Sequence, residues 1–112
     1  MSESKRGQSE YISILQKEGV SLQIEGVDDV ALAPAVARRA ISALRCSQMG
    51  ITGGEVWKKM GDRFVPTYDI WDVEETDYPS HDAYVLASLE IAERQVQKYA
   101  DSKDDVFVTL GI

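Results

Sequence analysis

A chain of 112 residues with 44% hydrophobic and 28% charged residues has the size and composition of one globular domain, which we expect to span residues 1–112. A formal net charge of −7 disfavours direct binding to nucleic acid, because basic side chains supply most of that affinity. The sequence has no apolar run long enough for a membrane span, starts with a polar segment and contains one cysteine. We therefore expect a cytoplasmic protein without an internal disulfide.

The first half of the chain predicts two helices with an extended segment between them. Residues 1–7 are polar, and we expect a disordered tail there. Residues 9–18 predict a short helix that Ser9 caps, with Ile12 and Leu15 on one face. Residues 20–24 alternate apolar and polar side chains, which indicates an extended segment.

A second helix is predicted from Pro34 to about Cys46, because proline suits the first helical turn. Two strands then follow, over residues 55–60 and 63–68, joined by the two-residue turn Gly61-Asp62. Glycine at the first central position fits a type II′ turn. Pro66 cannot donate a ladder hydrogen bond, so it indicates an edge, a bulge or a strand end.

The last elements are a third helix and a final strand. Ser80 is suited to cap the helix, which carries an apolar stripe at helical spacing from Val85 to Tyr99. Residues 106–110 are mostly apolar, which indicates a strand inside the sheet. The predicted fold is α+β, a small sheet with a β-hairpin and a C-terminal strand packed against about three helices.

No catalytic, cofactor or metal site is predicted. The glycines at 50, 53 and 54 lack the lysine of a phosphate-binding loop. The single histidine, His81, lies between a serine and an aspartate, but neighbours in sequence rarely form a catalytic set. The acids at 72–77 lack the ligand spacing of a calcium loop.

Charge and aromatic side chains indicate a recognition surface. Residues 64–93 contain no lysine or arginine, whereas they contain eight acids. Aromatic residues flank these acids and are suited to anchor an interface. Trp57 is equally compatible with a core position, and we expect Trp71 at a solvated rim. The candidate partner-binding residues are Glu55, Trp57, Tyr68, Asp69, Trp71, Asp72, Glu74, Glu75, Asp77 and Tyr78.

Two linked motifs resemble the immunity protein 40 family of bacterial polymorphic toxin systems. The first motif is Gly53, Gly54, Glu55, Val56 and Trp57, and the second is Pro66, Thr67, Tyr68, Asp69 and Trp71. The order of elements is similar from about residue 30 to the end of the chain. One departure is Glu55, where the family more often has aspartate, and it puts in doubt any fine hydrogen-bond role for this position.

The resemblance implies an antitoxin that binds and occludes a cognate toxin domain and has no enzymatic activity. An acidic partner surface suits a basic toxin, such as a nuclease with a positive substrate groove. An acidic adaptor or nucleic-acid mimic is an alternative, and a small metal-dependent hydrolase is a further one. The sequence leaves open the toxin's identity, the stoichiometry, self-association and whether the motif residues contact the partner or hold the fold.

Overall fold

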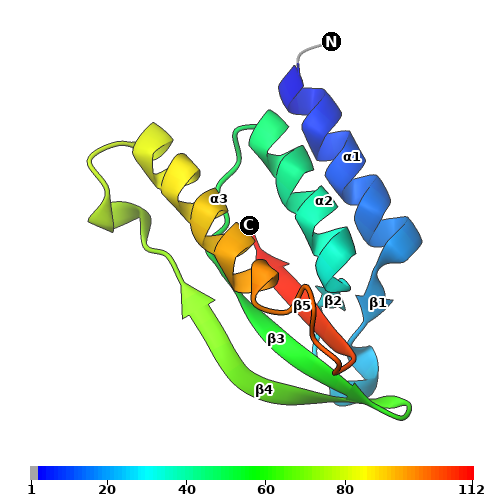
Figure 1. The fold of residues 1–112 in the computed structure, drawn as a ribbon. Coiled ribbons are helices and arrows are strands. Elements are labelled where there is room, and N and C mark those ends of the chain that lie inside the picture. The colour runs from blue at the N-terminus through cyan, green and yellow to red at the C-terminus, as the bar shows by residue number, and fades with distance from the viewer. Residues whose placement is uncertain (1–2) are drawn as a thin grey trace.

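The computed structural model describes residues 3–112, which form three α-helices and two antiparallel sheets (Figure 1). The helices are α1 (Glu3–Glu18), α2 (Pro34–Cys46) and α3 (His81–Gln97). The strands are β1 (Val20–Ser21), β2 (Val30–Ala31), β3 (Gly53–Met60), β4 (Arg63–Asp72) and β5 (Val106–Gly111), with short 3-10 turns η1 (Gln23–Glu25) and η2 (Glu75–Asp77). β1 pairs with β2, and the larger sheet has the order β4-β3-β5. The predicted α+β class is confirmed.

Helix α1 begins at Glu3, so the prediction of a disordered tail over residues 1–7 is wrong for residues 3–7. Residues 1 and 2 lie outside the described part of the chain. Gly7 lies within this added part of the helix, where a Cβ would lie 2.4 Å from the Ala43 carbonyl oxygen of α2. The missing side chain lets α1 pack closely along α2. The predicted apolar face also differs, since Ile12 is 53% exposed whereas Ile14 is 4% exposed.

The segment after α1 is extended only over β1. Leu22 is fully buried, and the chain then turns through η1 to Gly26, which has a positive φ of 77°. The alternating pattern of residues 20–24 therefore reflects one strand end followed by a turn. The prediction of a longer extended segment is wrong because the chain turns directly after Leu22, whose side chain is buried.

The hairpin of β3 and β4 confirms the prediction in type and register. Gly61 has a φ of 65°, as the first central residue of a type II′ turn requires. β4 is an edge strand, so Pro66 lies where a missing donor is tolerated. The Phe64 N–H also points away from β3 and donates to the Glu25 carboxylate at 2.9 Å.

Glu25 also pairs with the Arg63 guanidinium at 2.9 and 2.7 Å. These hydrogen bonds, first that from Arg63 and then that from the Phe64 backbone, lower the pKa of Glu25 to about 2. The η1 turn is thereby tied to the outer side of β4.

The two faces of the larger sheet are buried by different segments. Helices α2 and α3 lie across one face (Figure 1), where they cover Val56, Val108 and other core residues. On the opposite face, a smaller cluster joins Trp57 and Phe64 to Leu22 of the β1–β2 segment. Trp57 is thus a core residue, but it lies under this segment rather than under a helix.

Helix α3 and strand β5 are both present, but the prediction that the final strand lies inside the sheet is wrong. The Ala83 N–H donates to the Ser80 hydroxyl at 3.1 Å, which is the predicted N-cap. β5 is the outer strand next to β3 rather than an inner one, although Leu32 and Val108 form a single bridge on its other side. Across residues 3–112, none of the helices has the length and apolar content needed to span a membrane.

Candidate functional site

The two linked motifs lie side by side on β3 and β4, and Gly54 is the direct partner of Trp71. A Cβ at Gly54 would lie 2.3 Å from the Trp71 ring and 2.4 Å from the Thr109 carbonyl oxygen. Glycine is therefore required where the indole crosses the central strand. The prediction that Trp71 lies at a solvated rim is wrong, because its side chain is 7% exposed and belongs to the main core.

Both tryptophans act through packing in the folded protein. Trp57 is 6% exposed, and within residues 3–112 neither indole N–H has a hydrogen-bond partner. Their rings offer almost no surface to a partner. Local sequence could not have shown this, because the acids that flank Trp71 are exposed while the ring turns inward.

Residues 67–69 form a bulge in β4, which we call the β4 bulge. Trp57 pairs with Pro66 and Glu55 pairs with Ile70, so Val56 alone faces all three bulge residues. The Thr67 hydroxyl donates to the Val56 carbonyl oxygen at 2.8 Å. It also accepts a hydrogen bond from the Asp69 N–H at 3.2 Å. Thr67 thus replaces the backbone pairing that the bulge interrupts.

Asp69 fastens the β4 bulge to the end of α3. Its carboxylate accepts a short hydrogen bond from the Tyr99 hydroxyl and pairs with the Lys98 ammonium at 3.0 Å. The Tyr99 hydrogen bond is the main cause of the lowered pKa of Asp69, and Lys98 adds to it. Burial, together with Asp69, raises the pKa of Tyr99 to about 12. The charge of Asp69 is therefore engaged inside the molecule.

Tyr68, at the centre of the bulge, is 81% exposed. Its backbone has a positive φ of 67°, which is rare for a residue with a Cβ. Within residues 3–112, the Tyr68 hydroxyl has no hydrogen-bond partner, and its ring makes no aromatic or cation–π contact.

The acidic connection, residues 72–77, links β4 to α3. Asp72, Glu74, Glu75 and Asp77 are all exposed, as a recognition surface requires. Within residues 3–112, no lysine or arginine pairs with any of these four side chains. Of the other candidates, Glu55 and Tyr78 are half-buried, and Tyr78 packs edge-on against Tyr84 at 6.2 Å between ring centroids.

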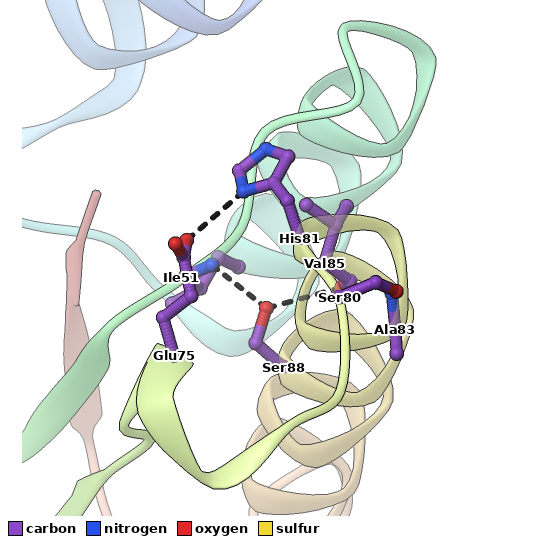
Figure 2. Close-up of polar contacts among 7 residues, drawn as sticks. All are labelled: Ile51, Glu75, Ser80, His81, Ala83, Val85 and Ser88. Carbon is purple, nitrogen blue, oxygen red and sulfur yellow. Dashed lines mark hydrogen bonds and ion pairs between the residues drawn. The ribbon is translucent and has the colours of Figure 1, made fainter.

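His81 contacts the acidic connection. Its Nδ1 lies 2.9 Å from the Glu75 carboxylate (Figure 2). The buried Ser88 hydroxyl nearby accepts a hydrogen bond from the Ile51 N–H and donates to the Val85 carbonyl oxygen, both at 3.0 Å (Figure 2). Ser88 thus joins α3 to the segment before β3, a link that the sequence pattern did not indicate.

Among residues 3–112, no group of three or more His, Cys, Asp or Glu side chains is placed to hold a metal ion. The helices, in contrast, carry mixed charge in ion pairs such as Arg45 of α2 with Glu93 of α3 and Arg39 of α2 with Glu18 of α1. The acidic connection differs from the helices because, within residues 3–112, its carboxylates have no lysine or arginine partner.

Comparison with known proteins gave one match. The family model described as Immunity protein 40 matches residues 21–112, a span that contains both motifs, the β4 bulge and the acidic connection. No curated protein and no solved structure matches the chain. The match covers most of the chain, and an immunity role follows from the family. The chain belongs to the immunity protein 40 family.

Proposed function

We propose that the protein neutralises a cognate toxin domain of a polymorphic toxin system by stoichiometric binding, with the acidic connection and the β4 bulge as its contact surface. The observation that supports this surface is the run of four exposed carboxylates without a lysine or arginine partner. Exposed carboxylates without a lysine or arginine partner remain free to attract a basic protein, whereas the charges in ion pairs such as Arg45–Glu93 largely cancel each other.

The partner that fits this surface is a basic protein domain. Complementary charge speeds association and selects the partner. A nuclease is one class of toxin with such a surface, since its substrate groove is positive. An interface of standard size would bury about 800 Å² on each partner. The adjacent β4 bulge extends the surface.

The proposed mechanism is occlusion, with no reaction catalysed by the antitoxin. One domain carries the whole function, and it acts in the cytoplasm of the cell that it protects. Of the ten candidate residues, the exposed acids and Tyr68 are the proposed contacts. The buried Trp57 and Trp71 would support the surface from inside, and Asp69 would hold the bulge in place.

Charge reversal tests this proposal. One variant changes Asp72, Glu74 and Asp77 to lysine. The matched control changes Glu10, Asp28 and Asp101, which are also exposed acids but lie elsewhere on the molecule, to lysine. Both variants shift the net charge by the same amount. The first should lose growth protection and associate at least about tenfold more slowly, because steering depends on local charge.

The assay co-expresses each variant with the C-terminal toxic domain of the large protein encoded immediately upstream. Protection by wild type and by the control variant, but not by the first variant, supports the proposed surface. Equal protection by all three would refute the acidic connection as the contact. A toxic domain that wild type leaves unrescued would refute this pairing.

A second candidate function is an acidic adaptor or nucleic-acid mimic, which the same unpaired acids favour. Such a protein would bind several basic proteins with similar affinity. Titration against a panel of unrelated basic proteins distinguishes the two, because an antitoxin should bind one of them far more tightly than the rest.

A further inference from the structure

The backbone at Tyr68 carries strain that the fold does not need for its own packing. Within residues 3–112, only Tyr68 and Gln48 combine a side chain with a positive φ. A left-handed backbone is unfavourable for an aromatic residue, whereas glycine and asparagine adopt it readily. Strain of this kind persists only where surrounding structure enforces it, and it concentrates at functional positions.

The structure that enforces this strain lies on both sides of Tyr68. Thr67 bonds to the Val56 carbonyl oxygen, and Asp69 bonds to Tyr99 and Lys98 of the segment after α3. None of these bonds uses the side chain of Tyr68. The ring is 81% exposed, so its own burial does not offset the cost of the backbone.

We propose that Tyr68 is the anchor residue of the toxin interface, and this rests on the proposed function. The phenol ring enters a concave site on the basic toxin, beside lysine or arginine side chains. Aromatic rings attract cations to their faces, and tyrosine is enriched among residues that dominate binding energy. Val65 and Ile70 are exposed along β4 on either side of the bulge and add apolar contact area.

The bulge makes the anchor effective because it fixes the ring's backbone before binding. Bulges on edge strands redirect a side chain, and this one turns Tyr68 away from the sheet. The bonds of Thr67 and Asp69 hold that geometry in the free protein. Binding then costs less conformational entropy in this segment than it would if the segment were a flexible loop. Thr67 and Asp69 are positioning residues in this scheme.

Three variants of Tyr68 separate anchoring from folding. Tyr68→Asn keeps a residue that tolerates the left-handed backbone but removes the ring, and Tyr68→Gly relieves the strain most fully. Tyr68→Phe keeps the ring and removes only the hydroxyl. We expect the Asn and Gly variants to melt at or above the wild-type temperature. We expect their affinity for the upstream-encoded toxin domain to fall at least about tenfold, with Phe close to wild type.

Calorimetric titration with the toxin domain and thermal melting of the free protein give the two readouts. The anchor is supported if wild type binds the toxin domain, the Asn and Gly variants bind it much more weakly, and neither variant melts at a lower temperature than wild type. Unchanged affinity of the Asn variant overturns the anchor while leaving the antitoxin function intact. A clear drop in melting temperature for both Asn and Gly overturns it as well, because the ring would then serve the fold. Failure of wild type to bind overturns the proposed function itself.

Discussion

Strand β3 has a neighbour on both sides, whereas strand β4 has a neighbour on one side only. Each carries one of the two linked motifs. The β3 motif is surrounded, so its glycines and its tryptophan are set by close contact with other segments. The β4 motif alternates between inward Trp71 and outward Tyr68. The two motifs of one family therefore contain both residues that stabilise the fold and residues that are exposed to solvent.

The largest effect should come from Trp71→Ala, because the indole lies in the main core over Gly54. Removing a buried tryptophan ring costs about 3–5 kcal/mol of unfolding free energy. Urea denaturation followed by circular dichroism measures this loss. Ile70→Ala is the matched control, since this neighbour is 55% exposed and should change stability by less than about 1 kcal/mol. Equal losses for the two variants would contradict the division between inward and outward residues.

A smaller loss, about 1–3 kcal/mol, is expected for Gly54→Ala, because the added methyl group would overlap the Trp71 ring and the Thr109 carbonyl oxygen. The double variant with Trp71→Ala sharpens the test by the same urea titration. The cost of Gly54→Ala should shrink in that background, since one of its two clashes is gone. A cost that stays constant would show that the glycine does not serve the tryptophan.

Asp69→Asn should cost about 1 kcal/mol, since it removes a partly exposed charge from the Lys98 and Tyr99 contacts. The pKa of Asp69 is lowered in the folded protein, so its contribution is present above the unfolded-state pKa and is lost as pH falls through the folded-state pKa. Amide exchange measured by NMR should speed up at Asp69 in this variant. The amides of β3, a strand with a neighbour on both sides, should keep their protection. Faster exchange at all amides would argue against a local role for Asp69.

The smallest and most pH-dependent effect is expected for Glu25→Gln. The folded-state pKa of Glu25 is about 2, below the unfolded-state value of about 4.3. Its stabilising contribution is therefore complete at neutral pH, declines below about pH 4 and disappears as pH falls through about 2. Melting curves between pH 7 and pH 2 should show the gap between wild type and variant closing over that window. Glu74→Gln, whose side chain has no ion pair in residues 3–112, should run parallel to wild type.

Elements with strong local signals could be predicted from the sequence. Pro34 begins α2, Ser80 caps α3, and Gly61-Asp62 closes the hairpin, each through chemistry confined to a few neighbouring residues. The acidic connection is exposed as predicted, because a dense run of acids is costly to bury. Its role in binding a partner stays a prediction.

Features that depend on distant segments could not be predicted in this way. The close approach of Gly7 in α1 to Ala43 in α2 is one such feature. The burial of Trp71 depends on Gly54 across the sheet. The bulge arises because three residues of β4 lie opposite one residue of β3, and neither strand shows this in its own sequence. Pro66 indicated an irregular edge, but nothing local showed that Tyr68 would be left-handed.

The outer side of β4 has a consequence for how the protein behaves when it is abundant. A bare edge strand offers free N–H groups on which a second chain can build a cross-β fibril. In β4, the Phe64 N–H donates to the Glu25 carboxylate, Pro66 has no N–H, and the β4 bulge interrupts the regular strand after Pro66. These three features disfavour fibril growth along β4. The proposed stoichiometric mechanism calls for an excess of antitoxin over toxin, and an edge of this kind disfavours aggregation at high protein concentration.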